Sequence, residues 1–436
     1  MRTAAIAYAL AILVVGLIVT LVMTRETETE KQEAVAAKEE AEKQPKPLPG
    51  DITPGPEIAE RVEQIRGQAF NGKAPEVQVV PEAELEKQLT ALDATPPSDK
   101  GLATASALLL AQAGALPAKQ AEQLVARRYG GTGVLGAYLP EGRKVLVSRE
   151  LAEEEPEVAE LVAAHELARA LDAGPAKDAP RVPPLFRDDE AAKVALRGGV
   201  ATQVERQYAA EHLGRDRSED SEVQLSRDAR DAPDTPPLLQ TLSAFPSEVG
   251  GAFVAGVHER GGWDAVDELL GEPPSTTAEL LHRDAGAPVP APEFSVQPLL
   301  GEEYKRVATA DVGELDTIGL LRAGVGEDEA AEAASGWRSG RFETYVKGGK
   351  PCPPPCRRQS ASVVVWRFAD DAASLAFVRA MRQAVIEGAA ARPEGGRGFV
   401  VGDGGAALVR AGRFAALTFA PDAPTAGELA TTALEG

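Results

Sequence analysis

The sequence has few of the residues that build metal and redox centres. It contains 2 Cys and 4 His among 436 residues. A site that needs four cysteines or three histidines is therefore nearly excluded. Positive charge is also scarce, because 46 Lys and Arg stand against 67 Asp and Glu, for a formal net charge of −21. A net-negative field repels nucleic acid, so we expect no nucleic-acid partner.

Several motifs of known chemistry are absent. The chain contains no GxSxG nucleophile elbow, and no internal repeat of fixed period is visible. The glycine-rich stretch at Gly402, Gly404 and Gly405 joins two short apolar segments, which indicates a hairpin turn rather than a phosphate-binding loop. Aromatic residues make up 5% of the chain, and we expect Trp337 and Trp366 to be core residues.

The amino end carries one long apolar run. Residues 4–23 contain no charged side chain and are followed by Arg25. About 20 such residues can span a bilayer, whereas the apolar part of a cleaved signal peptide is usually about 7–15 residues long. We expect a transmembrane signal anchor over residues 1–24, with a cleaved signal as the alternative. Arg2 precedes the span, so the positive-inside rule favours a single-pass protein of the cytoplasmic (inner) membrane with its bulk on the periplasmic or extracellular side.

The remaining chain changes composition twice. Residues 25–56 are rich in Glu, Ala and Lys and then in Pro, which is typical of a charged linker. In residues 57–293 the apolar residues have mainly helical spacing. In residues 294–436 segments of helical spacing alternate with segments of strand spacing. The predicted fold class is α+β: a mainly helical domain with a small edge sheet, followed by a smaller carboxyl-terminal α+β domain with an antiparallel sheet.

Local patterns place the elements. In the first domain they predict a strand over 76–80, a hairpin over 134–148, helices over 155–172 and 189–212, a polar loop over 215–237, and further helices over 246–282 with a break at Gly261 and Gly262. In the second domain they predict helices over 327–335 and 371–386, strands over 342–346, 361–368, 398–401, 406–410 and 413–419, and a closing helix.

The two cysteines flank three prolines. In an exported protein a disulfide between Cys352 and Cys356 is the default expectation. Three prolines in a polyproline II conformation would, however, separate the two Cα atoms by roughly 12 Å, beyond the limit of about 7 Å for a bridge. A bridge would need a cis-proline turn, so the sequence leaves the pairing open.

The motif that bears most directly on a possible reaction is His165-Glu166-Leu167-Ala168-Arg169, inside the helix predicted over 155–172. In the zinc peptidase pattern HExxH, two His one turn apart bind the metal, and the Glu acts as general base on the metal-bound water. Here the second ligand position holds Arg169. A guanidinium stays protonated and offers no lone pair to a metal, so Arg169 cannot be a ligand.

The sequence around this motif resembles a family of bacterial membrane-anchored zinc metallopeptidase-like proteins of the gluzincin type. The core of that family reads roughly VAHELxHALQDQ, then ALxEGDA, then GGWxxVxxxxxxPPxSTExxLHP. This chain has LVAAHELARALDA, then VALRGGVATQVERQY, then GGWDAVDELLGEPPSTTAELLH. The resemblance covers about residues 58–282 and is looser beyond them.

The resemblance assigns the first ligand to His165, the general base to Glu166, the second ligand to Arg169 and the third ligand to Gly198. An acidic partner of the family falls on Val200. Two of the three ligand positions therefore lack a ligand. The resemblance implies a degenerate member with a vestigial His165 and Glu166, no catalytic residue, and no metal or other cofactor.

Three explanations of the motif compete. The His-Glu pair is short enough to arise by chance. A rearranged zinc site could recruit Glu205 or His212, although Arg169 beside a dication is electrostatically unfavourable. In the third explanation, which we favour, Arg169 replaces the positive charge of the metal and pairs with Glu166 three residues before it.

The sequence therefore predicts a non-catalytic, pseudoprotease-like envelope protein that binds or regulates a protein or peptide partner and is attached to the membrane by its amino-terminal helix. The alternative is an active zinc-dependent peptidase with a rearranged ligand set. A purely structural stalk-and-head protein is the third possibility. Metal content and the effect of Glu166→Gln distinguish the first two.

Overall fold

The computed structural model describes residues 53–93, 99–124, 134–173, 180–213, 235–282, 286–287, 289–350 and 352–435. The predicted signal anchor, most of the linker and most of the polar loop over 215–237 lie outside these ranges. Within the described ranges, every helix is too short or too polar to span a membrane.

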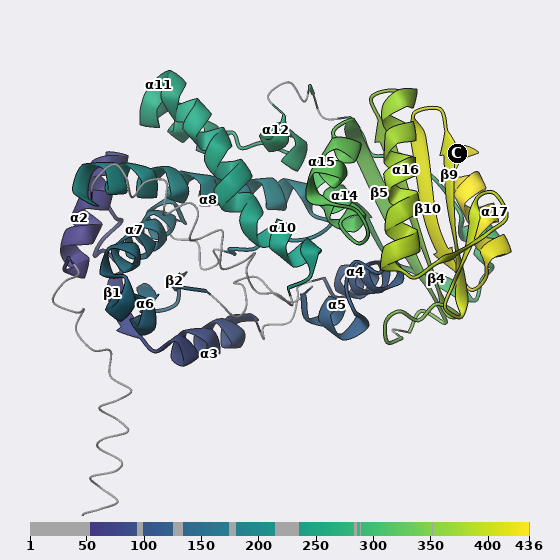
Figure 1. Ribbon diagram of the computed structural model, residues 1–436, viewed down its shortest axis with the longest axis horizontal. Helices are drawn as coiled ribbons and strands as arrows, with labels where there is room; N and C mark the ends of the chain where they lie inside the picture. The colour runs from purple at the N-terminus through teal and green to yellow at the C-terminus, as the bar shows by residue number, and fades with distance from the viewer. Residues whose placement is uncertain are drawn as a thin grey trace, which may run out of the picture.

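The amino-terminal half is mainly helical, and most of it lies on the left of Figure 1, whereas α4 and α5 lie right of the centre beside the large sheet. The predicted helices over 155–172 and 189–212 are confirmed, and the predicted break lies at Gly262, which has φ 65° inside α11. The helical elements, with π-helical turns written η, are α2 (Gly55–Arg66), α3 (Glu82–Asp93), α4 (Lys100–Gln112), α5 (Ala118–Leu124), α6 (Arg149–Glu154), α7 (Pro156–Ala173), α8 (Asp188–Tyr208), η1 (Ala209–Leu213), α10 (Pro237–Phe245), η2 (Pro246–Gly250), α11 (Gly251–Gly271) and α12 (Thr277–Leu281).

A small sheet lies beside α7. It consists of β1 (Glu76–Val80), β2 (Gly136–Leu139) and β3 (Lys144–Ser148) in the order β1-β3-β2. The predicted hairpin is confirmed, because β2 pairs antiparallel with β3, while β1 pairs parallel with β3. In this sheet β2 is an edge strand, and α7 packs against it and against β3.

The helix α7 is the centre of the first core. Its apolar stripe, Val158, Leu161 and Val162, is buried as its spacing predicts. This stripe belongs to one cluster with Ile58 and Val62 of α2 and with residues of α8. Because neighbours surround α7 on several sides, residues 163–170 are all buried too, and the His165-Glu166 motif lies inside the protein.

The carboxyl-terminal half is built on a seven-stranded sheet in the order β4-β5-β6-β10-β9-β8-β7, on the right of Figure 1. All its neighbouring strands are antiparallel, which confirms the predicted antiparallel sheet. Its elements are α13 (Gln297–Leu300), β4 (Tyr304–Asp311), α14 (Glu314–Leu321), α15 (Glu327–Ala334), β5 (Trp337–Lys347), β6 (Ser360–Phe368), α16 (Asp371–Gly388), β7 (Arg392–Glu394), β8 (Gly398–Val401), β9 (Gly404–Ala411), β10 (Phe414–Ala420) and α17 (Ala423–Glu435).

The two faces of this sheet are both covered. Side chains alternate between the faces along each strand. Val364 and Trp366 of β6 pack with α14, α15 and α16 on one face, whereas Val363 and Val365 pack with α17 on the other. Burial of both faces explains the continuous apolar run over 363–366, which alternates less than a strand with one exposed face would.

The larger hydrophobic core crosses residue 293, where the sequence predicts a domain boundary. The helix α4 packs on β4, β5 and β6, and its Leu109 and Leu110 belong to the same cluster as Trp366 and Phe377. Ala192 of α8 and Leu238 of α10 are also part of this cluster. The helical half and the sheet therefore share one core.

Candidate functional site

The carboxylate of Glu166 is the centre of a buried charged cluster. Arg181 Nη1 lies 2.8 Å from its Oε1, and Arg169 Nε lies 3.6 Å from its Oε2. The backbone N–H of Tyr138 on β2 donates to Oε2 at 2.8 Å. Glu166 is 1% exposed. Both oxygens of the residue that the resemblance assigns as general base are thus engaged by groups of this chain.

These contacts fix the charge of Glu166. Burial alone raises the pKa of its carboxyl, but Arg181, Arg169, His165 and the Tyr138 amide outweigh burial and hold the pKa below its usual value. The residue is therefore an ionised group between two guanidiniums. The pairing of Arg169 with Glu166 is the contact that the third explanation of the motif expects.

The first ligand position, His165, has a different partner. Its Nδ1 forms a hydrogen bond with Glu205 Oε2 of α8 at 2.9 Å. The pKa of His165 is lowered to about 3, chiefly by burial; Glu166 raises it, and Arg169 and Arg181 lower it. The imidazole is therefore neutral at pH 7 and shares one hydrogen bond with Glu205 through Nδ1.

The third ligand position cannot carry a side chain in this packing. A Cβ added to Gly198 would lie 2.5 Å from Pro246 Cβ, and one added to Gly199 would lie 2.2 Å from the carbonyl oxygen of Gly250. The two glycines let α8 pack closely against η2. A glutamate at position 198 would have to displace η2, so Gly198 has a packing role.

His212 lies away from this cluster. It is exposed on η1, and its ring centroid lies 4.9 Å from that of Tyr208. The Tyr208 hydroxyl donates to Glu160 Oε1 at 2.5 Å, and Arg61 binds the same oxygen at 3.1 Å. Of the two replacement ligands considered from the sequence, the structure brings Glu205 to His165 and leaves His212 at a separate network.

The residues present do not fit a zinc ion of the HExxH type. The second position holds a cation, and the third holds a glycine packed on Pro246. Within the described ranges, no group of three or more His, Cys, Asp or Glu side chains could hold a metal ion. We therefore derive no metal-dependent chemistry for this site.

The sequence motif at residues 165–169 did not predict two groups of the charged cluster around Glu166. Arg181 lies twelve residues after Arg169 in sequence, outside the helix, and its Nη1 also donates to the carbonyl oxygen of Gly136 on β2. The other member is the backbone amide of Tyr138, which no sequence pattern can mark. The approach of β2 to α7 brings the Tyr138 amide to Glu166, and the segment between α7 and α8 brings Arg181 to it.

The remaining histidines have structural contacts. His282 Nε2 pairs with Glu314 Oε1 at 2.8 Å. His258 lies inside α11, and there its ring contacts Trp263 and its Nε2 lies 3.1 Å from Gln207 Nε2.

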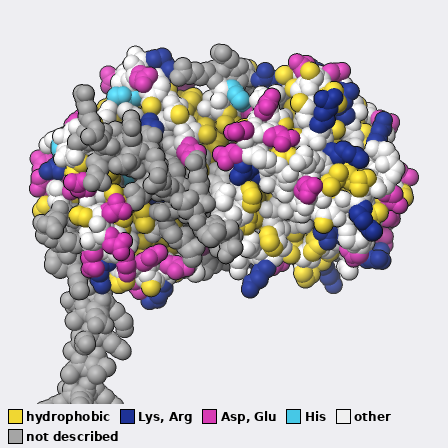
Figure 2. Space-filling view, in the orientation of Figure 1, with side chains coloured by type: hydrophobic (Ala, Val, Ile, Leu, Met, Phe, Trp, Pro, Cys, Tyr) yellow, Lys and Arg dark blue, Asp and Glu magenta, His cyan; other side chains and the backbone are white. Residues whose placement is uncertain are grey.

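A pocket of about 550 Å³ lies where the helical half meets the sheet. Its wall includes the start of α8, the residues before α12 and the starting residues of β5. Carboxylates outnumber cations in its lining, which includes Asp188, Asp189, Glu190, Asp311, Arg187 and Arg338. Acidic side chains gather in the middle of the face in Figure 2, near α12 and the start of α8. This lining disfavours an anionic ligand.

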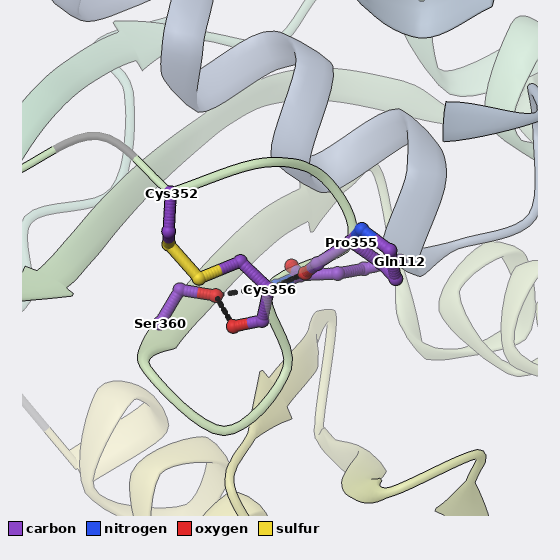
Figure 3. The surroundings of a disulfide bond; sticks show 5 residues. All are labelled: Gln112, Cys352, Pro355, Cys356 and Ser360. Carbon is purple, nitrogen blue, oxygen red and sulfur yellow. Dashed lines mark hydrogen bonds between the residues drawn. A yellow bond between two sulfur atoms is a disulfide. The ribbon is translucent and has the colours of Figure 1, made fainter. Parts of the chain in front are cut away.

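Cys352 and Cys356 form a disulfide, shown in Figure 3. Their Cα atoms are 5.8 Å apart, and the Pro354–Pro355 bond is cis, the turn that the sequence requires for a bridge. The loop docks on α4, because Gln112 Nε2 donates to the Pro355 carbonyl at 3.1 Å and to Ser360 Oγ at 2.8 Å. The disulfide loop thus helps to join the two halves.

A family model described as a domain of unknown function, DUF8575, matches residues 300–430. The match covers the seven-stranded sheet and most of its helices, and it excludes the His165-Glu166 motif. No curated protein and no solved structure matches the chain. The comparisons therefore concern the carboxyl-terminal half alone, and the metallopeptidase resemblance of residues 58–282 stays a prediction.

Proposed function

We propose that this chain is a non-catalytic, metallopeptidase-like protein of the cell envelope that binds or regulates a protein or peptide partner. The observation that carries the proposal is the pairing of Glu166 with Arg169 and Arg181, at 3.6 and 2.8 Å. Two guanidiniums supply positive charge beside the carboxylate that the resemblance assigns as general base. Membrane attachment through residues 4–23, with the bulk outside the cytoplasm, belongs to the same proposal.

The chemistry of Glu166 supports a structural role. A general base needs a free oxygen within hydrogen-bond reach of the proton that it removes. Glu166 is 1% exposed, and both of its oxygens have partners. Its lowered pKa also makes it a weaker base than an ordinary glutamate. The carboxylate stabilises the packing of β2 against α7 and is a poor catalyst.

The rival is a zinc-dependent peptidase with a rearranged ligand set. One observation favours it, because Glu205 lies 2.9 Å from His165, as a replacement ligand would. Against it, Arg169 would place a fixed positive charge beside the metal, and His212 lies at the Tyr208 network.

Zinc stoichiometry decides between the two. The full-length protein is purified in detergent without chelator, supplied with Zn²⁺, freed of excess metal and measured by elemental analysis. We expect far less than one zinc per chain and no change in the thermal midpoint on adding a chelator. One tightly held zinc per chain, lost in the Glu205→Gln variant, would establish the rival instead.

Peptidase activity gives a second readout. We expect no cleavage of unfolded polypeptide by the zinc-supplied protein, and no difference between the wild type and Glu166→Gln. Cleavage that Glu166→Gln abolishes would contradict the proposal, because it would show that Glu166 acts as a general base.

A further inference from the structure

The pocket between the helical half and the sheet has a buried carboxylate with an unused oxygen. Asp188, the first residue of α8, lines this pocket and is 8% exposed. Its Oδ1 accepts the N–H of Thr277 at 3.1 Å and the Thr277 hydroxyl at 2.6 Å. Its Oδ2 has no hydrogen-bond partner among the residues that the structure describes. Most buried polar atoms in proteins have a partner, so this oxygen is the natural acceptor for a donor group of a ligand.

The carboxylates next to Asp188 have cations, whereas Asp188 has none. Asp189 Oδ2 lies 3.0 Å from Lys193 Nζ, and Glu190 Oε1 lies 2.5 Å from Arg187 Nη2. Within the described ranges, Asp188 forms hydrogen bonds with α12 but no ion pair. An isolated charge is costly to bury. Asp188 is therefore the carboxylate of this lining that a positively charged ligand would stabilise most.

The charge of Asp188 depends on its surroundings. Its pKa is raised to about 6, chiefly by burial; the Thr277 hydrogen bonds lower it, and Glu314 and Asp189 raise it. At neutral pH most of the Asp188 carboxyl is therefore still ionised. A cation bound beside it would offset both burial and the repulsion from the neighbouring carboxylates.

The size and the apolar part of the pocket indicate the kind of cation. Its half-buried or exposed apolar residues are Leu102, Val289, Pro290, Ala291 and Ala310. Its volume of about 550 Å³ lies in the range of pockets that hold small organic molecules. No group of three or more His, Cys, Asp or Glu side chains in the described part of the chain could hold a metal ion. These observations favour an organic cation over a metal ion.

We propose that this pocket binds a small organic cation, with its ammonium group against Asp188 and its apolar body against Leu102, Val289 and Ala310. An ammonium group donates a charge-assisted hydrogen bond to a carboxylate, which is about twice as strong as a neutral one. The same chemistry is available from a free amine and from the lysine side chain of a peptide. The pocket lining shares no residue with the Glu166 cluster, so the inference goes beyond the proposed function and does not depend on it.

The test uses two probes of nearly the same shape, phenethylamine and phenethyl alcohol, which differ in the ammonium group. Their binding to the full-length protein in detergent is measured at neutral pH by isothermal titration calorimetry, with the heat of detergent alone subtracted. We expect phenethylamine to bind at least tenfold more tightly than phenethyl alcohol. A third probe, Nα-acetyl-lysine methylamide, represents a lysine side chain in a peptide. The cation that binds more tightly identifies the source of the ammonium group.

A single substitution locates the bound ammonium group. Asp188→Asn removes the charge and keeps an oxygen that can accept both Thr277 donors, so the fold should be retained. We expect its affinity for phenethylamine to fall at least tenfold and its affinity for phenethyl alcohol to stay unchanged. Asp403→Asn is the matched control, because Asp403 is an exposed aspartate that pairs with Arg358 outside the pocket lining. The control should bind both probes as the wild type does.

The pH dependence of the wild type gives a second measurement, which also serves if Asp188→Asn does not fold. An alkyl amine stays protonated below about pH 9, so the protein alone changes its charge at acid pH. Protonation of Asp188 should weaken phenethylamine binding as the pH decreases through about 6. Protonation of Glu314 or His282 acts in the same direction, whereas Asp316, with its pKa raised to about 8, is already mostly neutral at pH 7. The profile of Asp188→Asn should be shallower than that of the wild type.

Equal affinities for phenethylamine and phenethyl alcohol would overturn the inference, because they would show that the charge is not recognised. An unchanged affinity for phenethylamine in Asp188→Asn, or wild-type binding that stays constant as the pH falls below 6, would overturn it as well. None of these results changes the zinc content that tests the proposed function, so the two can fail separately.

Discussion

Glu166 accepts the backbone N–H of Tyr138 at 2.8 Å, which ties the helix that carries the peptidase-like motif to the edge of the small sheet. A buried amide without a partner costs about 1–3 kcal/mol. The hydrogen bond from Tyr138 to Glu166 removes that cost, because it gives the buried amide of β2 an acceptor. Arg181 and Arg169 in turn neutralise the charge of Glu166. These contacts give Glu166, Arg169 and Arg181 structural roles that require no catalysis.

Replacing Arg169 should destabilise the protein. Arg169→Ala removes one of the guanidiniums beside Glu166 and the donor to the Pro180 carbonyl, while Arg181 stays. We expect the free energy of unfolding to fall by about 1–3 kcal/mol, less than the loss of a sole buried partner. Thermal or denaturant unfolding of metal-free protein measures the change. Arg187→Ala, at an exposed ion pair, should change it by about 0.5 kcal/mol or less. An unchanged midpoint in Arg169→Ala would rule out the charge-replacement explanation.

Adding one methyl group at Gly198 should disturb the contact between α8 and η2. The new Cβ would lie 2.5 Å from Pro246 Cβ, so the helices must separate, and we expect Gly198→Ala to cost about 1–3 kcal/mol. Gly427→Ala in α17 is the matched control, because a Cβ there meets no atom within 4 Å. The control should be neutral or stabilising by up to about 1 kcal/mol. Equal denaturation midpoints for the two variants would contradict the packing role of Gly198.

Acid should destabilise the fold through His165. Its pKa is about 3 in the folded protein and near 6.5 when unfolded, so between these values the unfolded chain binds more protons. Stability should therefore fall as the pH decreases from about 6.5 toward 3, with His165 contributing up to about 1.4 kcal/mol per pH unit. In His165→Asn, which keeps an amide nitrogen for Glu205, the dependence should be shallower. Parallel pH profiles of unfolding for the two proteins would contradict this assignment.

Reduction of the Cys352–Cys356 disulfide should destabilise the carboxyl-terminal half. The loop closed by Cys352 and Cys356 is short, and the chain-entropy relation gives about 2 kcal/mol for a loop of that size. We expect a thiol reductant to lower the denaturation midpoint of the wild type. A Cys352→Ser, Cys356→Ser double variant should start at the lower value and show no response to reductant. Loss of the loop should also increase hydrogen exchange in α4, through its contact at Gln112.

Much of the secondary structure could be predicted from local patterns. The apolar spacing of residues 158–162 identified α7, and the turn residues at 140–143 identified the β2–β3 hairpin. Patterns missed several segments, among them β4 and α14. The strand β4 has a mostly exposed or half-buried surface with weak alternation, so its pairing with β5 gives it strand structure. The strand β5 also begins at Trp337, five residues before the predicted strand, because β6 extends the ladder.

The candidate site could be predicted in part. The sequence identified His165, Glu166 and Arg169 because they lie one turn or less apart on one helix. It could not identify Arg181 or the Tyr138 amide, because these come from other segments that meet α7 only in the folded chain. Among the replacement ligands, Glu205 faces His165 and His212 does not, a distinction that depends on how α8 packs on α7.

The sequence by itself determined that Arg169 and Gly198 cannot serve as metal ligands, since a guanidinium offers no lone pair and a glycine has no side chain. It also determined the helix that carries the motif, through local apolar spacing. The tertiary structure decided what the remaining polar groups do. Glu166 became a partner of β2 and Arg181, and Gly198 a contact for Pro246, because burial forces polar groups to find partners and backbones to pack without gaps.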